Sequence, residues 1–89
     1  MRLEAVFHAL SDPVRLEIVR ALADCGEARA CGTLGLTVSK STASHHFRVL
    51  REAGVIVTRE DGRKRLNELR REDMDARFPG LLDTVIASG

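Results

Sequence analysis

TVSKSTASHHFRVLREAG, residues 37–54, is the stretch that decides the fold. Its apolar residues Ala43, Phe47 and Leu50 recur at helical spacing and predict one buried helix face. Ser39 suits an N-cap and Gly54 suits the left-handed residue that ends a helix, so we expect a helix over about 39–53. At about 100° per residue, the opposite face is small, polar and basic. It carries Ser41, Ser44, His45 and Arg48.

This polar face has the chemistry of a DNA recognition helix. Hydroxyl side chains near a helix N-terminus let the backbone amides approach a phosphate, and longer side chains can reach base edges. The residues expected at phosphates are Ser39, Ser41 and Thr42. Those expected at bases are Lys40, Ser44, His45 and Arg48. By helical angle His46 borders the core, so we interpret it as structural and His45 as a DNA contact.

After Gly54 the pattern changes to a short β-branched run at 55–58, followed by a second candidate strand over 64–69. The Asp61-Gly62 pair between the two runs predicts a β-hairpin. Its tip carries Arg63, Lys64 and Arg65. A helix-turn-helix followed by a basic hairpin is typical of a winged helix, whose wing (here about 55–69) contacts the DNA backbone or minor groove. The alternative is an edge hairpin that charge keeps soluble.

The segments before this stretch are also predicted to be helical. Leu3, Val6, Phe7 and Leu10 have the spacing of a short amphipathic helix. Asp12-Pro13 predicts the start of a second helix that runs to about Asp24. Its expected core residues are Leu16, Ile18, Val19 and Leu22. One or two helical turns are expected over 28–34, as the first helix of the helix-turn-helix.

The C-terminal segment, about 71–88, is predicted to form helical pieces broken near Pro79 and Gly80. Its apolar stripe either closes the core or pairs with another subunit. The stripe consists of Leu81, Leu82, Val85 and Ile86.

Length and composition fit one domain over residues 1–89. The net charge is only +1, but residues 40–71 hold nine basic and four acidic side chains, whereas the rest of the chain holds five basic and nine acidic side chains. This asymmetry suits a polyanion on one side of the molecule. An aromatic content of 3% argues against a stacking platform for single strands. We expect a cytoplasmic protein, because the sequence has neither a membrane-spanning run nor a signal peptide.

These pieces resemble the ArsR/SmtB family of bacterial winged helix-turn-helix repressors. The matching stretches are LSDPVRLEIVRAL (10–22), VSKSTASHHFRVLREAGVI (38–56) and REDGRKRLNEL (59–69). The resemblance implies a homodimer, paired through its first and last helices, that binds a palindromic operator in double-stranded DNA until an effector releases it. The dimer positions it implies are Leu3, Val6, Phe7, Leu81, Leu82, Val85 and Ile86.

The effector site departs from the family pattern. Founding members of the family sense metals through a Cys-x-Cys pair before the recognition helix, or through Asp and His on the last helix. Here Cys31 stands alone and the last helix has no histidine, so neither metal site is intact and no cofactor is expected. Cys25 and Cys31 are packed thiols, a thiol switch, or two ligands of a soft metal with a third such as His8.

The sequence therefore predicts a mainly α protein with a small β-hairpin, a winged helix-turn-helix that dimerises through its N- and C-terminal helices. The predicted function is sequence-specific DNA binding in transcription regulation, as a repressor. The alternative is a winged-helix protein-interaction module without DNA binding. An enzyme is not expected, because Ser44 and His45 are neighbours on one helix and neighbours rarely achieve triad geometry.

Overall fold

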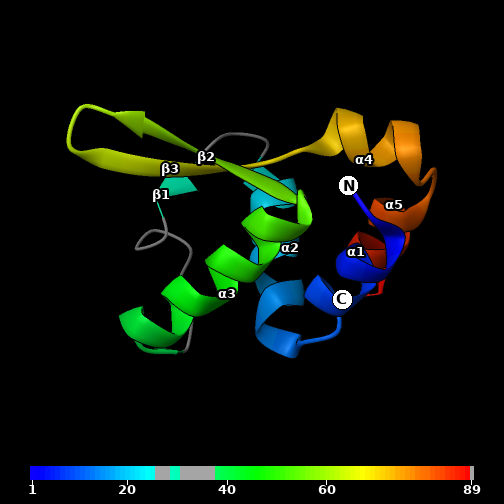
Figure 1. The fold of residues 1–89 in the computed structure, drawn as a ribbon, viewed down its shortest axis with the longest axis horizontal. Helices are drawn as coiled ribbons and strands as arrows, with labels where there is room; N and C mark the ends of the chain where they lie inside the picture. The colour runs from blue at the N-terminus through cyan, green and yellow to red at the C-terminus, as the bar shows by residue number, and fades with distance from the viewer. Residues whose placement is uncertain (26–28, 31–37, 89) are drawn as a thin grey trace.

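The computed structural model describes residues 1–25, 29–30 and 38–88, with only the backbone of Cys25, Arg29 and Ala30. In chain order these form α1 (Leu3–Ala9), α2 (Pro13–Cys25), β1 (Arg29–Ala30), α3 (Lys40–Ala53), β2 (Ile56–Asp61), β3 (Lys64–Leu69), α4 (Arg71–Arg77) and α5 (Leu81–Ala87). The hairpin of β2 and β3 lies along one side of α2 and α3 and extends beyond them (Figure 1). The fold is mainly α with a small sheet, as predicted.

The helix boundaries are confirmed where the sequence carries capping residues. At the start of α2, Asp12 Oδ2 accepts hydrogen bonds from two amides of the first turn, at 2.8 and 3.2 Å. At the start of α3, Ser39 Oγ accepts from the amide of Thr42 at 3.3 Å. Gly54 ends α3 with φ 86°, where a residue without Cβ is favoured. Local sequence therefore fixes both ends of α3.

The predicted hairpin is confirmed and its first strand runs further than expected. β2 continues to Asp61, which pairs with Lys64 across a two-residue turn of Gly62 and Arg63. Gly62 has φ 63°, and no described residue other than glycine has a positive φ. Glycine at the first central position is the requirement of a type II′ turn, whose twist suits a hairpin.

β1 corrects one prediction. It pairs antiparallel with β3, with Arg29 opposite Asn67, and gives a sheet of order β1-β3-β2. The helix expected over 28–34 is therefore wrong at residues 29–30, where pairing with a distant strand outweighs local preference. The rest of that prediction lies outside the described residues.

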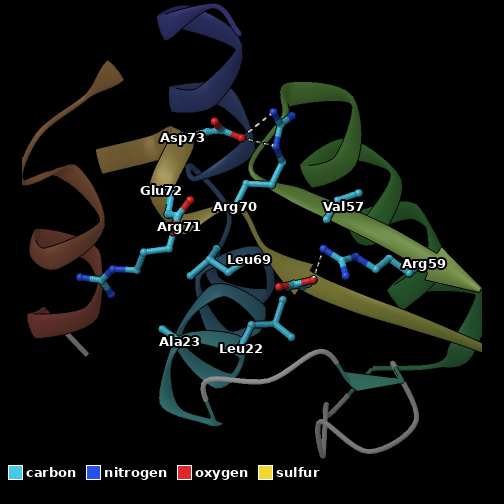
Figure 2. A pocket seen from close by; sticks show the side chains of 10 residues that line it. Leu22, Ala23, Val57, Arg59, Leu69, Arg70, Arg71, Glu72 and Asp73 are labelled. Carbon is cyan, nitrogen blue, oxygen red and sulfur yellow. Dashed lines mark hydrogen bonds and ion pairs between the residues drawn. The ribbon is translucent and has the colours of Figure 1, made fainter. Parts of the chain in front are cut away.

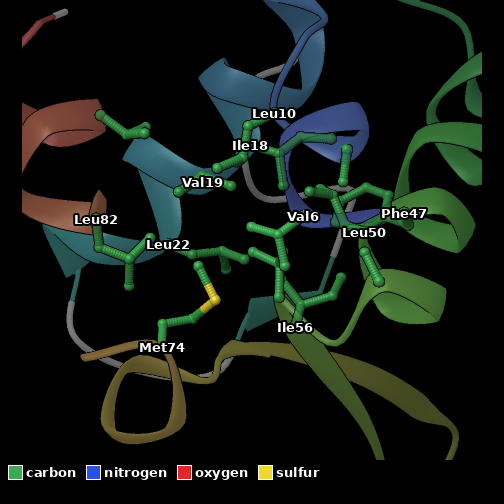
Figure 3. Close-up of a cluster of buried hydrophobic side chains, with 14 of the residues drawn as sticks. Val6, Leu10, Ile18, Val19, Leu22, Phe47, Leu50, Ile56, Met74 and Leu82 are labelled. Atoms are coloured by element: carbon green, nitrogen blue, oxygen red, sulfur yellow. The ribbon is translucent and has the colours of Figure 1, made fainter. Parts of the chain in front are cut away.

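Apolar side chains from all five of the described helices meet in one core (Figure 3). The predicted α2 stripe is confirmed for Ile18, Val19 and Leu22, which are buried, while Leu16 is half-buried. Leu82 of α5 is part of this core. The C-terminal helices thus close the core of the chain itself.

Candidate nucleic-acid interface

One face of α3 is exposed along its polar side. The side chains predicted to read bases, Lys40, Ser44, His45 and Arg48, are all exposed, while Phe47 is buried on the opposite side. The amphipathic prediction for this helix is therefore confirmed at the level of burial. Four side chains able to donate hydrogen bonds stand free of the core on one helix.

The N-terminus of α3 carries a cluster of exposed hydroxyl groups. Ser39 Oγ donates to Thr42 Oγ1 at 3.0 Å and lies 3.3 Å from Ser41 Oγ. Ser39 caps the amide of Thr42, and because these side chains are short, a large anion can approach the first-turn amides that Ser39 does not cap. The positive end of the helix dipole favours an anion at the same place.

The hairpin tip adds a second group of cations. Arg63, Lys64 and Arg65 are exposed on or beside the Gly62 turn. In Figure 1 this tip and the N-terminal end of α3 lie toward the same end of the molecule's long axis, and the N-terminus and α4 lie toward the other. The two predicted contact regions therefore share one end of the molecule.

A hollow of about 160 Å³ joins the helix to the hairpin. Arg48 and Arg51 of α3 and Arg65 of β3 line it, and Arg51 Nη1 donates to Thr58 Oγ1 at 3.4 Å across it. Sequence reasoning missed Arg51. The available signal was its position one helical turn after Arg48, which places the two on adjacent positions of one face. With Arg51 included, arginines of both α3 and the wing line this hollow.

The nine basic residues of segment 40–71 form two groups, those that pair with a carboxylate and those that do not. Arg59 pairs with Glu68 at 3.0 Å and Arg70 with Asp73 at 2.8 Å. Arg71 binds Asp83, a hydrogen bond that raises the pKa of its guanidinium. The other six have no carboxylate within 4 Å among the residues that the structure describes. We call them the free cations: Lys40, Arg48, Arg51, Arg63, Lys64 and Arg65.

The two adjacent histidines lie in different surroundings. His45 is exposed, whereas His46 is 8% exposed and its Nδ1 lies 3.1 Å from Arg15 Nη1. The ring centroids are 5.4 Å apart with planes tilted by 57°, so the two rings are in contact although only one of them is exposed. This burial agrees with the interpretation of His46 as structural, and it leaves His45 on the surface beside Ser44.

A larger hollow of about 680 Å³ lies between α2, the base of the hairpin and α4 (Figure 2). Leu22 and Leu69 form part of its apolar wall. Most of its charged groups are already engaged, with Arg59 bound to Glu68 and Arg70 to Asp73. It therefore presents few unsatisfied charges to a ligand.

The predicted dimer positions divide into three sets by their exposure. Leu3 and Phe7 are 44% and 53% exposed and line, with Phe78 and Leu81, an open hollow of about 400 Å³. Leu81 and Ile86 are half-buried. The remaining three are buried in the chain's own core, so the expectation that they face a partner is not met. These are Val6, Leu82 and Val85.

The two cysteines of the predicted thiol sensor are not among the described side chains. Cys31 lies outside the described residues, and so does the side chain of Cys25. Among the side chains that are described, no group of three or more His, Cys, Asp or Glu could hold a metal ion. None of the described helices is long and apolar enough to cross a membrane.

Comparison with known proteins identifies relatives over most of the chain. Residues 12–58 match the profile of the bacterial regulatory protein, arsR family. The uncharacterized HTH-type transcriptional regulator YceK of Bacillus subtilis is 43% identical over 82 residues, which are 90% of this chain and 82% of that protein. The arsenical resistance operon repressor of Staphylococcus xylosus is 39% identical over 74 residues, 82% of this chain and 70% of the repressor.

Solved structures agree with these sequence relatives. The transcriptional repressor BigR from Xylella fastidiosa superposes with a TM-score of 0.75 at 25% identity, over 97% of this chain and 84% of that one. The homodimeric winged helix-turn-helix DNA-binding domain Mb0332 from Mycobacterium bovis gives 0.73 at 27% identity, over 97% and 79% of the two chains.

Proposed function

We propose that this chain, which belongs to the arsR family of bacterial regulatory proteins, is a repressor that binds a palindromic operator as a homodimer. Membership of the family makes it a winged helix-turn-helix, DNA-binding regulator of transcription and not an enzyme. What we propose beyond this is the set of DNA contacts, the dimer face and the form of the operator.

The observation that carries the DNA contacts is the position of the six free cations. They lie on the exposed face of α3, in the hollow beside it and at the hairpin tip. Arg63, Lys64 and Arg65 bind phosphates, together with the first-turn amides and hydroxyls of α3. Base readout falls to the exposed side chains Lys40, Ser44, His45 and Arg48, because phosphate contacts position a protein and base contacts give it specificity.

The dimer face that we propose is built on Leu3 and Phe7 of α1 and on the start of α5. Leu3 and Phe7 are large apolar side chains that are 44% and 53% exposed, and they line one open hollow that a second copy of the chain can cover. The Mb0332 domain, similar in fold, is described as homodimeric. A two-fold axis through this face repeats the recognition helix, so two half-sites of a palindrome can be read.

The residues of this chain argue against the two metal sites of the founding family members. α5 contains no histidine, and its carboxylate Asp83 is bound by Arg71. Besides a soft-metal site of Cys25, Cys31 and a third ligand such as His8, the sequence offers a thiol switch through the two cysteines. It can be tested in the same titration as operator binding.

The experiment is a fluorescence-anisotropy titration onto DNA from upstream of the protein's own gene and onto a scrambled duplex, with reductant and with a mild thiol oxidant. We expect much tighter binding to the native duplex. Release by oxidant would make the cysteines the sensor, and equal binding in both conditions would reject a thiol switch. No preference for any duplex, including sites selected from random DNA, would refute the repressor and favour a protein-interaction module.

Sedimentation of Phe7→Glu tests the dimer face, because a charge at a half-exposed apolar position opposes pairing without entering the core. Glu72→Gln on the exposed side of α4 is the control for altered charge. A dimeric Phe7→Glu variant would place the interface elsewhere.

A further inference from the structure

Arg15 of α2 is a buried charge that the DNA interface does not use. It is 7% exposed, and its guanidinium makes three hydrogen bonds to other elements. Nε donates to the carbonyl of Ala9 at 2.7 Å and Nη2 to that of His8 at 3.3 Å, both at the end of α1. Nη1 lies 3.1 Å from His46 Nδ1 on α3. One side chain thus links three helices.

The chemistry of these groups fixes the direction of the bond to α3. A guanidinium stays protonated and can only donate, so His46 Nδ1 must accept and the imidazole carries its proton on Nε2. The last carbonyls of a helix lack intrahelical donors, and Arg15 supplies donors to two of them in α1. Asp12 Oδ2 lies 3.7 Å from His46 Nδ1 and provides the nearby negative charge. The planar fork therefore holds the end of α1 against α3 in one geometry.

The two helices that Arg15 joins carry the two surfaces of the proposed function. α1 presents Leu3 and Phe7, and α3 presents His45 and Arg48 to solvent. His46 is adjacent to His45, so a displacement of its backbone moves the side chains that read bases. A dimer reads two half-sites only if its recognition helices are about one DNA turn apart, roughly 34 Å.

We propose that Arg15 is a positioning residue that fixes the recognition helix relative to α1 and thereby sets the operator half-site spacing that the dimer accepts. This inference rests on the proposed homodimer and its two half-sites. It assigns Arg15 and its acceptor His46 a role in specificity, although neither faces the DNA side of α3.

A purely structural role for Arg15 makes a different prediction. A variant that only loses stability binds all duplexes less well, in proportion to the folded fraction, and keeps its preference among spacings. A variant that loses the positioning bond keeps its phosphate contacts and binds altered spacings almost as before. The ratio of affinities between native and altered spacing therefore separates the two roles.

The experiment uses a duplex selected by the wild-type protein from random DNA, and the same duplex with one or two base pairs added or removed at its centre. Arg15→Lys keeps the charge and loses the fork. His46→Asn keeps an acceptor near the Nδ1 position, and His46→Leu removes it. Ile18→Val, which creates a small cavity beside the same helix, is the control for a loss of stability alone. Urea unfolding and sedimentation are measured for every variant.

We expect the spacing ratio to fall about tenfold in Arg15→Lys and His46→Leu, comparable to losing one base-pair contact. It should stay near the wild-type value in His46→Asn and Ile18→Val. If Arg15→Lys does not fold, the two His46 variants carry the test. Unchanged ratios in folded Arg15→Lys and His46→Leu overturn the positioning role alone. A wild-type protein indifferent to spacing overturns the palindrome proposal as well.

Discussion

The salt dependence of DNA binding measures how many phosphate contacts the wing makes. Arg63 and Lys64 are exposed at the hairpin tip and have no carboxylate partner among the described residues. Removing both in Arg63→Ala/Lys64→Ala takes away two candidate phosphate contacts per subunit, or four per dimer. Each neutralised phosphate contributes about 0.9 to the slope of log K against log salt, so the slope should become shallower by about 3.6.

This change is large enough to measure without ambiguity. Between about 50 and 200 mM salt, the affinity of the wild-type protein should fall by a factor about 150 larger than that of the variant. The loss should be similar for native and scrambled duplexes, because phosphates carry no sequence information. The free energy of unfolding should stay within about 0.5 kcal/mol of the wild-type value, as is usual for exposed positions.

The assay is anisotropy at five or more salt concentrations, and the matched control is Arg2→Ala/Arg77→Ala. The control removes the same charge from two exposed residues at the N-terminus and the end of α4, which lie toward the other end of the molecule (Figure 1). Its slope should remain that of the wild type. An unchanged slope in the wing variant, or an equal change in the control, would refute the assignment of the wing to phosphate binding.

Three further predictions concern stability. Leu50→Ala, at a fully buried position of α3, should lower the free energy of unfolding by about 2–5 kcal/mol in urea denaturation; a loss below ~1 kcal/mol would contradict the packing. Gly62→Ala should weaken the hairpin through its positive φ of 63°, since nothing lies within 4 Å of the added Cβ, and NMR should show a disturbed wing with an intact core. Burial raises the pKa of the Asp12 carboxyl, but hydrogen bonds from the amides of Arg15 and Val14 and the positive charge of the Arg15 guanidinium outweigh it, so the pKa lies below 3.8. The stability that the charge contributes is therefore present above about pH 4 and is lost as the pH falls through the folded-state pKa. Asp12→Asn keeps a capping group but loses the charge, so it should be less stable than wild type at pH 7 and equally stable in acid. A stability difference between these two proteins that is independent of pH would contradict this prediction.

Much of the fold was predictable because its signals are local. The ends of α3 depend on Ser39 and Gly54, and the hairpin depends on the turn at Gly62, all within a few residues of the elements that they end. β1 carries no comparable signal. Its two residues are a strand only because Asn67 and its neighbour on β3 supply the pairing partners.

Apolar periodicity cannot distinguish a face that packs on its own chain from one that packs on another copy. The stripes of α1 and α5 predicted a buried face, yet Val6 and Leu82 pack inside the chain while Leu3 and Phe7 stay exposed. Only the three-dimensional arrangement separates them, because both sets have the same chemistry and spacing.

The burial of Arg15 could be predicted from the sequence, but its partner could not. Arg15 continues the stripe of Ile18, Val19 and Leu22 at helical spacing, so its position on the core side of α2 could have been read from the sequence. Its partner could not, since His46 lies 31 residues away and no local pattern relates the two. A charged residue on an apolar stripe thus indicates that a partner exists without identifying it.

The charge count of residues 40–71 suggests a polyanionic partner, but only the fold shows which of these cations have no carboxylate partner among the described residues. Residues 40–71 carry nine basic side chains, but the carboxylates Glu68, Asp73 and Asp83 engage three of them near the base of the hairpin and α4. The pairing leaves six free cations on α3 and the wing. Because the field of a charge is weakened by a close counter-charge, the positive potential concentrates where the recognition helix and wing meet. In the proposed function, the acidic residues therefore help to direct DNA to one end of the molecule, because they neutralise cations elsewhere.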